Sequence, residues 1–128
     1  MGLLDLSAEF SHIIFQAGKP VQLNLVLYNN TDSLMEVALE LADTPGEEWN
    51  TRLMGRSMSY QVRQVSVSAE DLTRLRMVVD IPEDAAPGDH MFTITARAMD
   101  GRFADTLTLV VTVEGAEGGT ASIELESR

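Results

Sequence analysis

Strict alternation of apolar and polar residues limits, more than any other feature, how this chain can fold. The segment VQLNLVLYNN at positions 21–30 has an aliphatic residue at every second position up to Leu27. Similar alternation recurs at residues 35–41, 73–82, 90–98 and 105–115. Successive side chains of a strand point to opposite faces of a sheet, so the pattern predicts antiparallel strands with one buried and one wet face. The residues expected to meet in a common core include Leu23, Leu39, Leu75, Phe92 and Leu109.

Turn-forming residues separate these segments. They cluster at residues 17–20, 29–33, 43–46, 68–71, 84–88 and 99–101. The pair Asp100-Gly101 predicts a tight hairpin between the last two runs, which should therefore be neighbours in a sheet. Roughly seven strands at such spacing are typical of an all-β fold, an antiparallel β-sandwich.

Two prolines lie in the segment DIPEDAAPGDH at positions 80–90. Pro82 cannot donate to a sheet ladder and should end the strand before it. Pro87 has a fixed backbone angle and Gly88 tolerates turn conformations, so the chain should reverse ahead of His90. This segment predicts the crossover from one sheet of the sandwich to the other.

The order of these features resembles the NEW3 family, also called the α-galactosidase-associated domain. That family has a Gly-containing turn, a strand ending in Asn-Thr or Asn-x-Gly, a Pro-x-x-Trp segment, a strand ending in Val/Ile-Pro, and a Pro-Gly-x-Tyr turn before an alternating run. The matching positions here are Gly18, Asn30–Thr31, Trp49, Ile81–Pro82 and Pro87–Gly88. The resemblance covers roughly residues 8–114, and the related CARDB modules share much of it. It implies an immunoglobulin-like antiparallel β-sandwich of about seven strands.

One position departs from the family pattern. Where the family usually has a tyrosine after Pro-Gly-x, this chain has His90. The tyrosine suits a corner in which its hydroxyl donates a hydrogen bond to the upstream backbone. An imidazole N–H can donate to the same carbonyl, so we expect His90 to serve as the corner residue.

Acidic residues dominate the charge of the chain. It has 20 Asp and Glu against 9 Lys and Arg, a formal net charge of −11, and no cysteine. Nucleic acid and anionic lipid are repelled by such a surface, and the sequence shows no Lys/Arg cluster, so neither is expected as a partner. Without cysteine the chain has neither disulfides nor thiolate-held metal centres.

One domain is expected over residues 1–114, followed by a glycine-rich flexible tail or linker over residues 115–128. The first residues lack the pattern of a signal peptide, and no window is apolar enough to span a bilayer, so membrane insertion of this segment is not expected. The resemblance implies an extracytoplasmic or cell-surface location within a longer protein. A chain complete as given would instead be cytoplasmic.

Residues suited to catalysis are sparse. His12 and His90 are the only histidines, and the sequence has neither a nucleophile elbow nor a phosphate-cradling glycine loop. We therefore expect no enzyme activity and no cofactor.

Two groups of potential metal ligands occur, and neither is expected to bind a metal. The carboxylates that could converge on calcium at the crossover are Asp80, Glu83, Asp84 and Asp89. The soft or borderline ligands that could hold copper are Met54, Met58, His90, Met91 and Met99. Turn carboxylates are usually solvated and methionines usually fill cores. His90 and Met91 should also point to opposite faces of their strand.

The single tryptophan, Trp49, lies in the segment GEEWNTRL at positions 46–53. An exposed indole beside Arg52 could stack on a sugar ring. The alternative, which we favour, is an indole that plugs the end of the sandwich under its loop.

The last two long strands should present a face of threonines to solvent. Its members are Thr93, Thr95, Thr106, Thr108 and Thr112, and Val110 with Val26 could pack on a neighbouring domain. The predicted function is a non-catalytic accessory or spacer domain that contacts neighbouring domains or other proteins. The alternative is a carbohydrate-binding module, associated with glycoside hydrolases, that uses Trp49 and Arg52.

Overall fold

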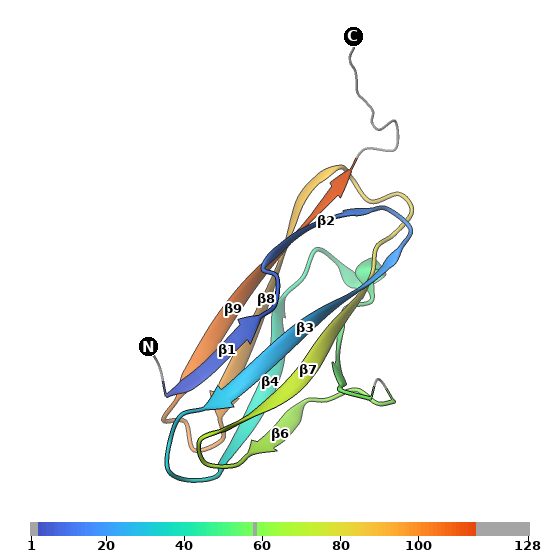
Figure 1. Ribbon diagram of the computed structural model, residues 1–128. Helices are drawn as coiled ribbons and strands as arrows, with labels where there is room; N and C mark the ends of the chain where they lie inside the picture. Colours follow the sequence, from blue (N-terminus) through green and yellow to red (C-terminus); the bar gives the residue numbers. More distant parts are fainter. Residues whose placement is uncertain (1–2, 58, 115–128) are drawn as a thin grey trace.

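The computed structural model describes residues 3–57 and 59–114 (Figure 1). These residues form nine strands and one short 3-10 helix. The elements are β1 (Leu4–Ala8), β2 (His12–Gln16), β3 (Pro20–Asn29), β4 (Met35–Asp43), η1 (Glu47–Trp49), β5 (Arg52–Gly55), β6 (Gln64–Val67), β7 (Asp71–Asp80), β8 (Gly88–Ala98) and β9 (Ala104–Glu114).

The strands form two sheets that pack face to face (Figure 1). One sheet has four strands in the order β1-β3-β7-β5, and the other has five in the order β2-β9-β8-β4-β6. The predicted all-β, immunoglobulin-like sandwich is confirmed, with nine described strands where about seven were expected. The short strands β1, β2, β5 and β6 have only four or five residues each, the shortest length over which alternation indicates a strand.

Alternate burial along the long strands builds the core. The five residues expected to meet at its centre, one from each long strand, are all at most 7% exposed and belong to one cluster. These residues are Leu23, Leu39, Leu75, Phe92 and Leu109. Burial of each such side chain contributes about 1.5–3 kcal/mol of transfer free energy. The predicted division of each long strand into a buried face and a solvent-facing side is therefore confirmed.

The predicted crossover joins β7 of the four-stranded sheet to β8 of the five-stranded sheet. The Nε2 atom of His90 lies 2.7 Å from the carbonyl oxygen of Ala86, and since a carbonyl can only accept, the imidazole donates. The corner hydrogen bond predicted for His90 is therefore present.

The hairpin predicted at Asp100-Gly101 joins β8 to β9, which pair antiparallel from Gly88↔Val113 to Arg97↔Ala104. Its connection runs from Met99 to Phe103 and is longer than a tight two-residue turn. Gly101 has a φ of +80°, a conformation that L side chains rarely adopt.

The N-terminal segment is divided between the two sheets. Strand β1 pairs antiparallel with β3, whereas β2 pairs parallel with β9, from His12↔Val110 to Gln16↔Glu114. The backbone N–H of Leu6 donates to Asp105 Oδ2 at 2.7 Å, which ties β1 to the opposite sheet. Together β1 and β2 bridge the two sheets along this side of the sandwich.

The two described ends of the chain lie at opposite ends of the long axis (Figure 1). The carbonyl of Leu3 accepts from the N–H of Asn30, in the β3–β4 loop, and we call this end the N-terminal pole. Glu114 pairs with Gln16 at the other end, the C-terminal pole. Residues 115–128, predicted to be a tail, lie outside the described residues, so that domain boundary stays a prediction.

Candidate interaction surface

Trp49 is buried beneath its loop. The indole is 3% exposed, and its ring centroid lies 4.6 Å from that of His90 and 5.9 Å from that of Phe92. The indole therefore fills the end of the sandwich beneath its loop, which is the alternative that we favour from the sequence. Stacking on a sugar requires an accessible indole face, so the carbohydrate-binding role of Trp49 stays a prediction that this geometry does not favour.

Arg52, the second residue of that predicted sugar site, lies in a closed polar network. Its Nη1 atom donates to Asp80 Oδ2 at 3.2 Å and to the carbonyl of Asn50 at 2.7 Å. The side-chain amide of Asn50 donates to the same Asp80 oxygen at 2.8 Å. The network holds the loop after η1 against β7. The negative charge of Asp80 is balanced by Arg52.

The carboxylates considered for calcium are not brought together into a site. Asp80 is engaged by Arg52, whereas Asp89 Oδ1 accepts a hydrogen bond from Thr112 Oγ1 at 2.6 Å on the five-stranded sheet. Within residues 3–57 and 59–114, no group of three or more His, Asp or Glu side chains has the arrangement of a metal site.

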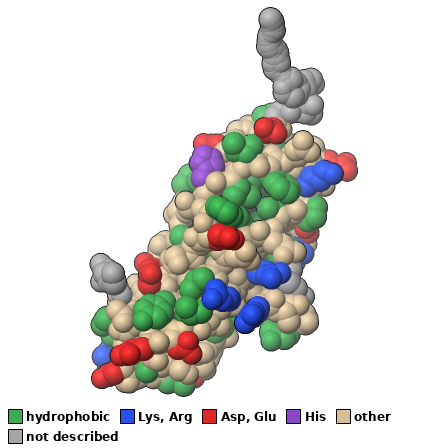
Figure 2. Space-filling model, viewed as in Figure 1, with side chains coloured by type: hydrophobic (Ala, Val, Ile, Leu, Met, Phe, Trp, Pro, Cys, Tyr) green, Lys and Arg blue, Asp and Glu red, His purple; other side chains and the backbone are tan. Residues whose placement is uncertain are grey.

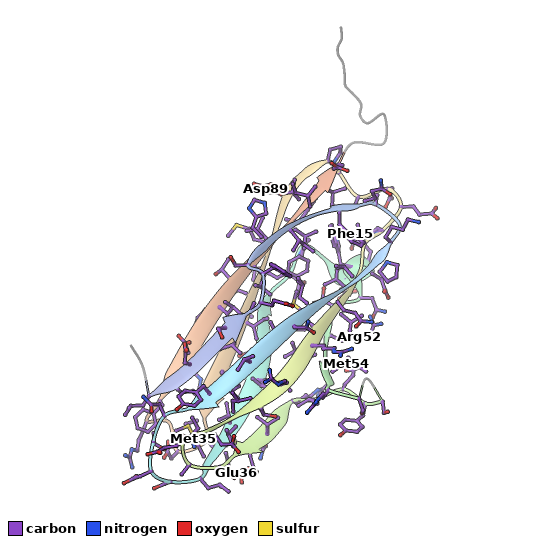
Figure 3. The ribbon with its side chains drawn as sticks, in the orientation of Figure 1. Phe15, Met35, Glu36, Arg52, Met54 and Asp89 are labelled. Carbon is purple, nitrogen blue, oxygen red and sulfur yellow. The ribbon has the colours of Figure 1, made fainter. Side chains whose placement is uncertain are left out.

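The residues considered for copper are also separated. Met54 lies on β5 of one sheet and Met91 on β8 of the other, and Figure 3 shows Met54 and the β8 residue Asp89 on different flanks of the molecule. Met99 lies in the β8–β9 connection at the N-terminal pole. Met58 lies outside the described residues.

The threonine face predicted for the last two long strands is confirmed, with Thr93↔Thr108 and Thr95↔Thr106 as cross-strand pairs. Val110 lies between Met91 and His12 in the same sheet, whereas Val26 lies on β3 of the other sheet, so the prediction that the two valines form one apolar spot was wrong.

A hydrogen-bonded row crosses the end of this face. Thr112 Oγ1 donates its single proton to Asp89, so it accepts from His12 Nε2, which lies 2.7 Å away. A hydroxyl that already donates to a carboxylate is not activated by the imidazole, so the row is not a nucleophile–base pair. It links β2, β9 and β8 instead.

The N-terminal pole carries an exposed apolar group, which we call the pole patch. Leu3, Leu34 and Met99 are 46%, 60% and 57% exposed. They line an open hollow of about 500 Å³ together with the acidic residues Asp32 and Glu36. Large apolar side chains gathered at an exposed surface are typical of contact sites.

The outer face of the four-stranded sheet carries three arginines that sequence reasoning missed. Arg56, Arg74 and Arg76 line one hollow of about 470 Å³, here called the arginine groove. Figure 2 shows Lys and Arg side chains gathered midway along this face, with acidic side chains both close to them and towards its ends. Alternation places Arg74 and Arg76 on one face, but only the pairing of β5 with β7 adds Arg56.

No family profile matches this chain, and no curated protein is similar to it in sequence. The resemblance to NEW3 therefore stays a prediction. Within the described residues, no helix has the length and hydrophobicity needed to cross a membrane.

Solved structures share the fold. A family 123 glycoside hydrolase from Clostridium perfringens superposes with a TM-score of 0.67 at 15% identity, over 86% of this chain and 27% of that one. A protein of unknown function from Porphyromonas gingivalis W83 gives 0.59 at 13% identity, over 91% of this chain and 50% of that one. A FixG-related protein from Vibrio parahaemolyticus gives 0.58 at 10% identity, over 86% of this chain and 94% of that one. This chain thus spans about a quarter of the glycoside hydrolase, and at these identities the likeness concerns the fold alone.

Proposed function

We propose that this chain is a non-catalytic, immunoglobulin-like spacer domain of NEW3 type that joins neighbouring domains of a longer extracytoplasmic or surface protein. The observation that carries the proposal is the placement of Leu3 and Glu114 at opposite poles (Figure 1). A domain that the chain enters at one pole and leaves at the other separates its neighbours by its own length. Strand β9, with 11 residues, alone extends for about 35 Å.

The pole patch supports contact with a neighbouring domain. Leu3 directly precedes β1 and is a member of the patch, so a domain joined ahead of β1 would lie against Leu34 and Met99. Covering these exposed side chains removes apolar area from water and fixes the angle between the two domains.

The accessory role is supported by the hydrogen bonds of the two histidines, the side chains best suited to acid–base catalysis. His12 is hydrogen-bonded to Thr112 and His90 to Ala86, so both histidines serve the fold. The fold also occurs as about a quarter of a much larger glycoside hydrolase chain, as expected for an accessory unit.

Spin-label distances between the poles test the spacer. The chain has no cysteine, so labels attach only at the substitutions Lys19→Cys and Ser33→Cys, one near each pole. Double electron–electron resonance should give one narrow distribution at roughly 30–40 Å. The same protein in urea, as the control, should give a broad one. A broad or two-peaked distribution in native buffer would contradict a fixed spacing.

A further inference from the structure

The arginine groove is built by the tertiary fold. Arg74 and Arg76 are two positions apart on β7, so both side chains leave the outer face, about 7 Å apart along the strand. Gly55 of β5 pairs with Leu75, and Arg56 follows directly, which brings its side chain beside Arg74. Three of the chain's 9 basic residues therefore line one hollow of a protein with 20 acidic residues.

These guanidinium groups lack carboxylate partners. In the part of the chain that the structure describes, the recorded ion pair is Arg52–Asp80, which lies outside the groove. Arg76 donates to Gln22 Oε1 at 3.2 Å, a neutral acceptor. Glu9, in the groove wall, accepts instead from the side-chain amide of Asn24 at 2.9 Å. Like charges directly opposite each other on neighbouring strands are destabilising, so the charges of Arg56 and Arg74 do not stabilise the pairing of β5 with β7.

A second hollow adjoins the arginine groove and has a different lining. It has a volume of about 460 Å³, shares Arg56 and Arg74 with the groove, and adds Tyr60 and Leu72. Tyr60 is 62% exposed and Leu72 is 39% exposed. Leu72 lies on the same face of β7 as Arg74, so the positive charge adjoins an exposed aliphatic side chain. Tyr60, in contrast, lies against Gly55 on the side of β5 that faces the other sheet.

We infer that the arginine groove binds an extended acidic peptide segment of a partner protein or neighbouring domain. Carboxylates at alternate positions of an extended peptide are also about 7 Å apart and match Arg74 and Arg76. Guanidinium groups bind carboxylates through paired N–H donors. An apolar side chain of the peptide would lie against Leu72, which shares the outer face of β7 with Arg74 and Arg76. A nucleic-acid strand fits less well, because it needs basic residues along its length, whereas the chain has a net charge of −11.

Fluorescence anisotropy on the full chain tests this inference. The probe is a labelled peptide in which glutamates alternate with serines, and the comparison probes are its glutamine counterpart and a single-stranded oligonucleotide. We expect the glutamate peptide to bind, and to bind more weakly as salt rises. The double variant Arg74→Gln with Arg76→Gln should lower its affinity at least about tenfold.

The matched control is Arg63→Gln with Arg97→Gln, which removes the same charge from exposed arginines outside the groove. It should leave peptide affinity nearly unchanged, and thermal melts confirm that both double variants fold. Equal losses in the two variants, equal binding of the glutamine peptide, or tighter binding of the oligonucleotide would each overturn the inference. The spacer role is measured by pole-to-pole distance, so either idea can fail without the other.

Discussion

Asn29 is a completely buried polar residue at the end of β3. Its amide group lies within 2.8–3.1 Å of the carbonyl oxygens of Ser33, Val67 and Ser68. Its Oδ1 atom accepts from the N–H and the hydroxyl of Thr31 at 3.0 and 2.7 Å. One side chain thus holds the β3–β4 loop against the β6–β7 turn at the N-terminal pole.

Asn29→Ala should lower the free energy of unfolding by about 2–4 kcal/mol, because several buried backbone groups lose their partner at once. Urea denaturation provides the measurement. Asn24→Ala is the matched control, since Asn24 is exposed on the same strand and donates one side-chain hydrogen bond. Its effect should stay within about 0.5 kcal/mol. A similarly small effect at Asn29 would show that these contacts are replaced by water.

His90 combines the corner hydrogen bond with a contact to Trp49. His90→Ala should cost about 1–2 kcal/mol of stability, because both interactions are lost. His90→Tyr should keep or raise stability, because the phenol hydroxyl can donate to the upstream backbone and its ring can pack on the indole. Urea denaturation measures both variants. A tyrosine variant as unstable as the alanine variant would count against the corner role.

Trp49 is the single tryptophan, so the tryptophan fluorescence of the protein reports on the surroundings of this residue alone. With the indole 3% exposed, its fluorescence emission should lie to the blue and resist quenching by acrylamide. Added sugars should leave the emission unchanged. A red, readily quenched emission would instead place the indole at the surface and favour the carbohydrate-binding alternative.

At the scale of elements, β2 is one of four short strands. It lies at the edge of the five-stranded sheet and pairs only with β9. Ile13 and Phe15 pack against the core, whereas Ile14 is 62% exposed. The hydrogen-bonded row from His12 through Thr112 to Asp89 adds to this packing and to the ladder with β9 in holding β2 in place.

Thr112→Val removes this row while keeping the shape of the side chain. Amide hydrogen exchange in β2 should become about 2–10-fold faster, as expected for the loss of about 0.5–1.5 kcal/mol of local stability. Thr108→Val is the control, because Thr108 lies on the same strand and face and pairs with Thr93. Faster exchange of β2 in both variants would mean that the row contributes nothing specific.

At the scale of the whole molecule, charge opposes folding. The net charge is −11, and the ion pair Arg52–Asp80 offsets little of it. Compaction brings the carboxylates together, so their mutual repulsion is larger in the folded chain. The same repulsion keeps copies of the chain apart in solution.

Salt should therefore stabilise this protein. Raising NaCl from about 10 mM to about 200 mM should increase the melting temperature by a few degrees, because the screening length falls to below about 10 Å. KCl is the control and should act equally, since screening depends on ionic strength. A melting temperature that falls with salt would show that attractive charge pairs outweigh the repulsion.

The core and the positions of the long strands along the chain were predictable from residue patterns. Alternation in β3, β7, β8 and β9 depends only on neighbouring residues, because side chains of a strand point to its two faces in turn. The crossover at Pro82 and Pro87 was predictable for a similar reason, since proline limits the backbone locally.

Tertiary structure alone decided which distant residues meet. The parallel pairing of β2 with β9 joins positions that are nearly a hundred residues apart, and no local pattern encodes that choice. The arginine groove arises in the same way, because Arg56 reaches Arg74 only through the pairing of β5 with β7. The sequence by itself therefore determined which face of each long strand is buried. The packing of the two sheets decided which surfaces are available to a partner, because those surfaces are assembled from separate strands.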